Sequence, residues 1–337
     1  MDNQVIEKFN NLLTLSVRKE ASDVYLISGQ KPSAKIHGNL EFLAQENVDP
    51  DLLAEFVFNI LPSEEAREKV AQGYEFDMIY RFGENRFRTN IHLQQGAFAL
   101  SIRIIVSNIP TPEFLGFSPV MMKLAKLKKG LILLTGSTAS GKSSVIASLL
   151  NMINSESKVH IITIEDPIEF IYPVKQSVIE QRQIGVDSHS FYDALRASFR
   201  QDPDVIMIGE LRDLESIETA LMASETGHLV FATIHSSSTV ESIERIVNMF
   251  PAVQSQQILN QLASNLVAVV SRELLHKKGG VGRIASYEIM VNTPAVSSLI
   301  REHRLPNIVS VMQMGSRDGM TTMSQSKADL RSKGLIE

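Results

Sequence analysis

The sequence predicts an α/β protein with two domains, a smaller α+β domain followed by a larger one built on a doubly covered sheet. Its 337 residues suit two domains of ordinary size. The hydrophobic pattern changes near residue 106, and after that point continuous apolar runs alternate with helical segments. With 44% hydrophobic and 21% charged residues, the composition is that of a globular protein with enough apolar side chains for two cores.

The smaller domain is expected over residues 1–106. Apolar residues at helical spacing predict a helix over 5–17, and the segment 51–61 predicts another. Apolar or alternating residues predict strands over 24–27, 76–81, 86–93 and 98–104. Two prolines then interrupt regular structure, so 107–113 is expected to be a linker.

The larger domain, 114–337, is expected to contain a parallel sheet because its apolar runs show no alternation, as in strands buried on both faces. These runs cover 131–134, 161–164, 205–208 and 229–234. Helices are predicted over 145–153, 192–199, 217–221 and beyond, 240–247 and 258–270. Alternating strands and helices are typical of right-handed crossovers on a sheet covered on both faces.

Charge and composition exclude several classes of function. A net charge of -5 gives no general attraction for nucleic acid, so no nucleic-acid partner is expected. The absence of cysteine excludes disulfides and cysteine-ligated zinc. No apolar stretch reaches the roughly 18 residues that a membrane span needs, and a cytoplasmic protein without a span is expected.

The strongest motif is Gly136-x4-Gly141-Lys142-Ser143, which follows the apolar run 131–134 and opens a predicted helix. Glycines let backbone N–H groups surround phosphate oxygens at a helix N-terminus, whose partial charge favours an anion. Lys142 is expected to reach the β and γ phosphates of a nucleotide, and the Ser143 hydroxyl to ligate Mg²⁺. The structural alternative is a glycine-rich turn, which would not require this strand and helix context.

Carboxylates follow two of the predicted strands. The run 204–210 has the Walker B form, an apolar strand that ends in Glu210, which is expected to act on the Mg²⁺ shell or a water molecule. Glu165, Asp166 and Glu169 follow the strand 161–164, and one of them is expected to orient or deprotonate the attacking water. A buried strand that happens to end in an acid and a solvated acidic turn are the alternatives.

Two histidines, His228 and His235, lie at the two ends of the apolar strand 229–234. Residues at this odd spacing point to opposite faces of a strand, which argues against a zinc pair. A histidine that senses the γ phosphate from the strand end is the preferred hypothesis, and a hydrogen-bonded core histidine is the alternative for each.

Together these segments resemble the type IV pilus retraction ATPases, the PilT/PilU branch of the secretion ATPase superfamily. The resemblance covers nearly the whole chain and rests on ordered blocks at 21–26, 86–90, 136–143, 164–170, 200–213 and 225–235. It implies a PAS-like N-terminal domain, a RecA-like P-loop ATPase domain and a homohexameric ring. ATP is the substrate and Mg²⁺ the metal that it implies.

The resemblance also implies roles for single residues, with Glu169 as the catalytic glutamate and Glu210 as the Walker B acid. The catalytic set is then Lys142, Glu165, Glu169, Glu210, His228 and His235, with Ser143 and Glu210 at the metal. The nucleotide-binding set is Gly136, Ser137, Thr138, Ala139, Ser140, Gly141, Lys142, Ser143 and Ser144, together with the N-terminal arginines Arg86, Arg88 and Arg103. Without the resemblance, these arginines would be interpreted as solvated strand ends.

Three positions depart from the family pattern. Ala139 stands where glycine is usual, Ser144 where threonine is usual, and Ser297 where retraction motors often carry arginine. A small residue at position 139 still lets the loop bend, so nucleotide binding is expected to survive.

The function that the resemblance implies is a hexameric motor that couples ATP hydrolysis to pilus retraction, at the cytoplasmic face of the inner membrane. Its expected partners are other copies of the chain, an inner-membrane platform protein and a paralogous retraction ATPase. The alternative is a weakly active accessory subunit similar to PilU, which the departures motivate. An extension or secretion ATPase would often carry a four-cysteine zinc element, and the sequence has no cysteine. A DNA-translocating motor should show a basic strip or aromatic stacking residues, whereas this sequence has no tryptophan and a slightly acidic balance.

Overall fold

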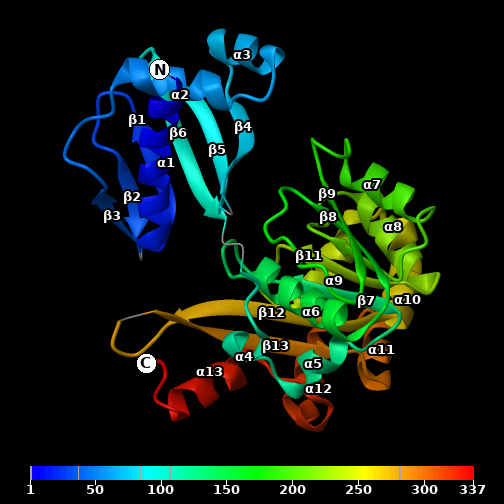
Figure 1. Ribbon diagram of the computed structural model, residues 1–337. Helices are drawn as coiled ribbons and strands as arrows, with labels where there is room; N and C mark the ends of the chain where they lie inside the picture. Colours follow the sequence, from blue (N-terminus) through cyan, green and yellow to red (C-terminus); the bar gives the residue numbers. More distant parts are fainter. Residues whose placement is uncertain (1, 37, 84, 106–107, 281) are drawn as a thin grey trace. The chain divides into compact units, whose positions relative to one another are not determined.

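The computed structural model describes residues 2–36, 38–83, 85–105, 108–280 and 282–337 (Figure 1). The chain divides into two compact units, Met1–Asn108 and Ile109–Glu337. The predicted domain boundary at residues 106 and 107 lies outside the described residues. Helix α4 (Pro112–Leu115) begins inside the segment that the sequence assigned to a linker.

The N-terminal unit is an antiparallel sheet with strand order β3-β2-β1-β6-β5-β4. The strands are β1 (Ala21–Ile27), β2 (Ser33–Ile36), β3 (Asn39–Phe42), β4 (Phe76–Phe82), β5 (Asn85–Gln94) and β6 (Ala97–Ile105). Its helices are α1 (Asp2–Arg18), α2 (Pro50–Ile60) and α3 (Glu64–Ala71).

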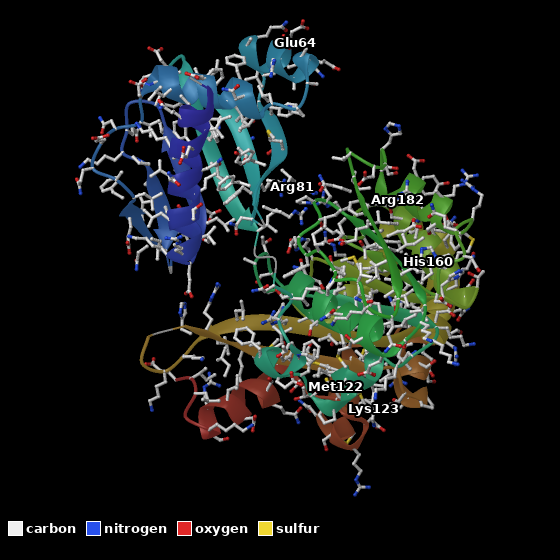
Figure 2. All side chains as sticks on the ribbon, in the orientation of Figure 1. Glu64, Arg81, Met122, Lys123, His160 and Arg182 are labelled. Carbon is white, nitrogen blue, oxygen red and sulfur yellow. The ribbon has the colours of Figure 1, made fainter. Side chains whose placement is uncertain are left out.

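The core of this unit lies between the sheet and the helices α1 and α2. Val24 and Leu26 of β1 are buried against Phe9 of α1 and Phe56 of α2, because alternate residues of a strand point to opposite faces. The other face of the sheet is more polar, and charged side chains such as Arg81 on β4 and Glu64 on α3 are exposed (Figure 2).

The C-terminal unit contains a mostly parallel sheet with strand order β13-β12-β7-β11-β10-β8-β9. The strands are β7 (Gly130–Thr135), β8 (His160–Glu165), β9 (Val178–Gln183), β10 (Val205–Ile208), β11 (Leu229–Ile234), β12 (Leu266–His276) and β13 (Arg283–Val291). Neighbouring strands pair in parallel except β12 and β13, which form an antiparallel pair at one edge. The sheet is therefore mixed, whereas the sequence predicted a parallel one.

Helices cover both faces of this sheet, as β7 illustrates. Ile132 and Leu134 pack toward α4, α5 (Pro119–Leu124) and α6 (Lys142–Glu156), while Leu131 and Leu133 pack toward the opposite layer. That layer includes α7 (Phe191–Ser198), α8 (Leu214–Glu225), α9 (Thr239–Met249) and α10 (Ser255–Asn265). The short helices α11 (Pro294–Arg301), α12 (Ile308–Met314) and α13 (Met323–Ser332) complete the unit.

The predicted fold class is confirmed, an α/β chain with a smaller N-terminal α+β unit, but one predicted helix is wrong in its extent. The helix expected over 258–270 ends at Asn265, and the next residues begin strand β12. Leu266 to Val270 continue the apolar spacing of α10, yet they are rich in β-branched residues and pair with β7. Pairing with a central strand outweighs a spacing that fits either structure.

A hydrogen bond connects helix α4 to the edge strand β13. The Tyr287 hydroxyl, on β13, donates to the Leu115 carbonyl at a distance of 2.8 Å, and both residues are buried. The first helix after the N-terminal unit is thereby tied to the edge strand of the sheet.

Candidate functional site

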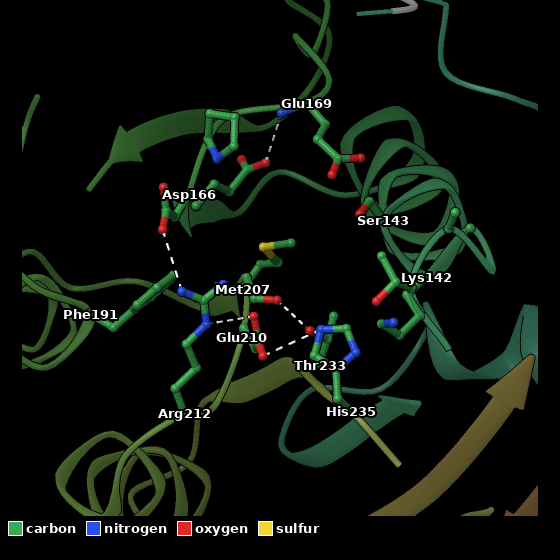
Figure 3. Close-up of a pocket in the computed structure, with 16 residues that line it drawn as sticks. Lys142, Ser143, Asp166, Glu169, Phe191, Met207, Glu210, Arg212, Thr233 and His235 are labelled. Carbon is green, nitrogen blue, oxygen red and sulfur yellow. Dashed lines mark hydrogen bonds and ion pairs between the residues drawn. The ribbon is translucent and has the colours of Figure 1, made fainter. Parts of the chain in front are cut away.

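A pocket of about 270 Å³ lies where β7, β8, β10 and β11 end (Figure 3). The carboxyl ends of parallel strands are the usual place for ligands in such sheets. Its lining residues are Thr138, Ala139, Gly141, Lys142, Ser143, Glu165, Asp166, Pro167, Glu169, Phe191, Met207, Gly209, Glu210, Arg212, Thr233 and His235. Five of the nine predicted loop residues are among them, and so are five of the six predicted catalytic residues: Lys142, Glu165, Glu169, Glu210 and His235.

The predicted phosphate loop connects β7 to the N-terminus of α6. Its glycines take positive φ angles, 139° at Gly136 and 84° at Gly141. A Cβ atom at Gly136 would lie 2.4 Å from the Arg272 carbonyl oxygen, and one at Gly141 would lie 2.1 Å from Arg272 Nη1. The loop therefore requires glycine at both positions, for its backbone conformation and for its close packing.

Lys142 and Ser140 give this loop groups that suit a phosphate. Lys142 is buried, and its Nζ donates to the carbonyl oxygens of Gly136, at 2.8 Å, and Ser137, at 3.0 Å. Burial lowers the pKa of Lys142, while the carboxylates of Glu210 and Glu169 oppose that shift. The buried Ser140 hydroxyl has no hydrogen-bond partner within the described part of the chain. A phosphate at the N-terminus of α6 would engage both the ammonium and the backbone N–H groups.

Ala139 adopts a positive φ of 62° in the same loop. An L-residue in this left-handed region is strained, whereas glycine is not. The structure therefore gives a backbone reason for the glycine that is usual at this position.

Glu210 is the centre of a polar cluster beyond β10. Its Oε2 accepts from Arg212 Nε at 2.6 Å, and its Oε1 lies 3.3 Å from His235 Nε2. Arg212 also lies 3.6 Å from Asp166, and the Thr233 hydroxyl donates to the Gly209 carbonyl, which fixes the backbone next to Glu210. Figure 3 shows these contacts inside the pocket.

The surroundings of His235 favour its neutral form. Burial lowers the pKa of His235, and nearby Lys142 lowers it further, while Glu210 opposes the shift. A neutral imidazole can donate one hydrogen bond and accept another, so His235 can connect Glu210 to a ligand or a water molecule.

In the acidic turn after β8, the carboxylates of Glu165 and Glu169 lie in different surroundings. Glu165 is buried and accepts hydrogen bonds from the Thr163 hydroxyl (2.6 Å), the Gln181 amide (3.2 Å) and the Glu169 backbone N–H (3.4 Å). Burial raises the pKa of Glu165 despite these bonds. Glu169 is exposed, and its carboxylate points toward Ser143 in Figure 3. Glu165 thus positions the turn, and Glu169 offers a carboxylate to a ligand.

His228 is not part of this pocket, contrary to the sequence-based grouping. It precedes β11, and the seven steps from His228 to His235 span about 23 Å at a rise of about 3.3 Å per residue. Its Nδ1 lies 3.0 Å from the Ala223 carbonyl, and its ring meets the edge of Phe199. His228 therefore packs at the end of α8 and at the amino end of β11, opposite the strand ends that line the pocket.

The predicted arginines belong to the N-terminal unit. Arg86 and Arg88 lie on β5, and Arg103 lies on β6 in register with Arg88. Arg103 Nε pairs with the Asp23 carboxylate at 2.9 Å, and Arg86 is buried. The phosphate loop belongs to the other unit.

Two functional candidates were missed from the sequence, Arg212 and Arg272. Arg212 follows Glu210 by two residues, and this short spacing after a strand end was a usable signal. Arg272 lies far along the chain, and its Nη1 donates to the Gly141 carbonyl at 2.7 Å. Only the parallel pairing of β12 with β7 brings it to the loop, and sequence spacing does not reveal that pairing.

The pocket fits a magnesium ion that is held mainly by nucleotide oxygens and water. Ser143 and Glu210 supply oxygen donors, and Mg²⁺ usually takes few protein ligands beside phosphates and waters. Among the described residues, no group of three or more His, Cys, Asp or Glu side chains could hold a metal by itself.

Comparison with known proteins places the chain in a family. Residues 1–280 match the family described as type II/IV secretion system protein. The chain is 37% identical to the type IV pilus retractation ATPase PilT of Pseudomonas aeruginosa, over 96% of this chain and 94% of that protein. It is 36% identical to the type IV pilus ATPase PilU of the same organism, over 98% and 86%.

The solved structures include a pilus retraction motor PilT with bound ADP, which is 41% identical in sequence. The two structures superpose with a TM-score of 0.88, and the alignment covers 96% of this chain and 94% of the PilT chain. Within the described residues, no helix is both long enough and apolar enough to cross a membrane. The chain therefore belongs to the secretion-system ATPase family, in its branch of PilT-like pilus retraction ATPases.

Proposed function

We propose that this chain is a hexameric motor that couples ATP hydrolysis to type IV pilus retraction, removing pilin subunits at the cytoplasmic base of the pilus. The observation that carries the proposal is that one pocket brings Lys142 of the phosphate loop together with the carboxylates of Glu169 and Glu210. Its similarity to PilT, whose solved structure holds ADP, supports a nucleotide in this place.

Each residue of the pocket has its own proposed role in ATP hydrolysis. Lys142 exchanges the carbonyls of Gly136 and Ser137 for phosphate oxygens and balances their charge. Glu169 accepts a proton from the attacking water. Ser143 and Glu210 would hold Mg²⁺, with Glu210 acting through a water, and the ion would neutralise charge on the phosphates.

We further propose that the ring completes each site. Arg86, Arg88 and Arg103 are the candidates that a neighbouring subunit's N-terminal unit brings to the nucleotide, across a linker at 107–113. An inner-membrane platform protein and a paralogous retraction ATPase are the proposed partners of the ring, which is peripheral to the membrane.

The alternative is an accessory subunit that resembles PilU and supports a more active paralogue. Two features favour it: the strained φ angle of Ala139 and the surroundings of Ser297. Ser297, on α11, is buried, and its hydroxyl donates to the Ala263 carbonyl of α10 at 2.7 Å. This position therefore packs inside the unit and does not present a cation to a partner.

Phosphate release by the purified chain tests the site assignment. Lys142→Ala, Glu169→Gln and Glu210→Gln should each lower ATP turnover by at least about tenfold, about 1.4 kcal/mol of barrier. Glu218→Gln, on the exposed face of α8, is the matched control and should keep parental turnover. Parental turnover in purified Glu210→Gln would refute the assignment.

The same assay separates the motor from the accessory subunit when it is run with and without a paralogous retraction ATPase. An independent motor hydrolyses ATP alone at a rate that the paralogue does not change. An accessory subunit releases little phosphate alone and changes the rate of the mixture.

A further inference from the structure

Arg272 lies directly behind the phosphate loop. It follows Ser271, which pairs with Thr135 at the end of β7, so β12 places it beside the start of the loop. Its Nη1 donates to the Gly141 carbonyl at 2.7 Å, and its own carbonyl packs against Gly136. One residue on β12 therefore supports both ends of the loop.

The guanidinium of Arg272 is buried without a counter-charge. The residue is 7% exposed, and no carboxylate of the described residues lies within ion-pair distance of it. Its Nε is buried with no hydrogen-bond partner among those residues. Arginine stays protonated in such surroundings, so the positive charge persists. A buried, unpaired charge is costly, and an apolar side chain would fill the same space more favourably.

Tyr287 holds the guanidinium in place from the other side. The centre of the guanidinium lies 5.7 Å from the Tyr287 ring centroid, a cation–π distance. Burial raises the pKa of Tyr287 to about 12, so the phenol is neutral, and its hydroxyl is engaged by the Leu115 carbonyl. The ring therefore cannot supply the missing negative charge.

We propose that Arg272 is a positioning residue for nucleotide binding: a buried cation that fixes the loop at Gly141 and raises its affinity for polyphosphate. The bound phosphates supply the counter-charge that the protein does not, and the loop carbonyl that Arg272 holds orients the adjacent N–H groups. This inference rests on the proposed nucleotide-binding function of the pocket.

The test compares Arg272→Gln and Arg272→Lys with the parental chain by calorimetric titration of ADP and by ATPase kinetics. Arg272→Gln should weaken ADP binding by about tenfold or more, because both the charge and the fixed loop are lost. Arg272→Lys keeps the charge but not the planar donor fork, so it should restore part of the affinity and remain about threefold or more below the parental chain. KM should rise more than kcat falls, because Arg272 does not touch the reacting atoms.

Arg283→Gln is the matched control, since Arg283 is an exposed cation on the adjacent strand β13, and it should bind ADP like the parental chain. A lower thermal midpoint of Arg272→Gln with parental ADP affinity would mean a structural role alone and would overturn the proposal. If Arg272→Gln does not fold, parental affinity in Arg272→Lys overturns it. Failure of the parental chain itself to bind ADP would instead refute the proposed function.

Discussion

Ala139 holds a backbone conformation that glycine adopts without strain. Its φ of 62° lies in the left-handed region, which costs an L-residue about 1–2 kcal/mol. The hydrogen bonds from Lys142 to Gly136 and Ser137 keep the loop in this shape. The loop thus stores strain beside the place where phosphate is proposed to bind.

Replacing Ala139 with glycine should release this strain. We expect Ala139→Gly to stabilise the chain by up to about 1 kcal/mol, because the added freedom of the unfolded chain offsets part of the gain. The measurement is the free energy of unfolding in urea. Ala328→Gly, in the exposed interior of α13, is the matched control and should lose about 1 kcal/mol. A loss of the same size in both variants would contradict the strain.

At single residues, the pocket contains predicted residues that adjoin a strand end in the sequence, whereas residues that reach it through strand pairing were not predicted. Lys142 and Glu210 were placed in the pocket because each directly adjoins a strand end. His228 lies outside the pocket because it precedes β11, whereas the loop lies at the carboxyl ends of the parallel strands. Arg272 could not be placed, because the start of its own strand, β12, was predicted as part of a helix.

At the scale of elements, the turn after β8 is held by a buried carboxylate. Glu165 joins the turn to β8 through Thr163, to β9 through Gln181 and to the Glu169 backbone. Burial outweighs these hydrogen bonds and raises the pKa of Glu165 above 4.5. Above pH 4.5 the folded chain therefore binds more protons at this carboxyl than the unfolded chain, so its contribution to stability falls as pH rises.

A glutamine at position 165 should remove this pH dependence. We expect the free energy of unfolding of the parental chain, measured against Glu165→Gln, to fall between pH 5 and pH 8. The measurement is urea unfolding of both chains at the two pH values, with Glu218→Gln as the exposed control. A difference between the two chains that stays constant over this range would mean that Glu165 is not shifted.

The predicted elements differ in how well local sequence defines them. β7, β10 and β11 are apolar throughout because they are buried on both faces, and they were predicted. β9 is a half-exposed edge strand whose polar residues resemble a loop, and it was missed. β12 was missed because its start continues the helical spacing of α10.

At the scale of the whole molecule, the proposed ring predicts that subunits share their sites. Arg88→Ala and Lys142→Ala should each lower turnover about tenfold or more as pure proteins. Mixed rings should regain activity, because some sites then combine an intact Lys142 with an intact Arg88 from the neighbour. The measurement is phosphate release across mixing ratios.

Arg81→Ala provides the control for that mixing experiment. Arg81 is exposed on β4, the strand next to Arg88, and its loss should leave the pure protein active. A mixture of Arg88→Ala and Lys142→Ala with no recovery at any ratio would mean that each subunit completes its own site.

The hydrogen bond between Tyr287 and Leu115 also connects the segment that follows the N-terminal unit to the edge of the larger sheet. Residues 109–111 lead directly into α4, whose Leu115 carbonyl accepts a hydrogen bond from Tyr287 on the edge strand β13. Since the same tyrosine ring lies against Arg272, the anchor of the connecting segment and the support of the loop share one side chain. A pull on the segment before α4 would therefore act on the same tyrosine that lies against the support of the loop.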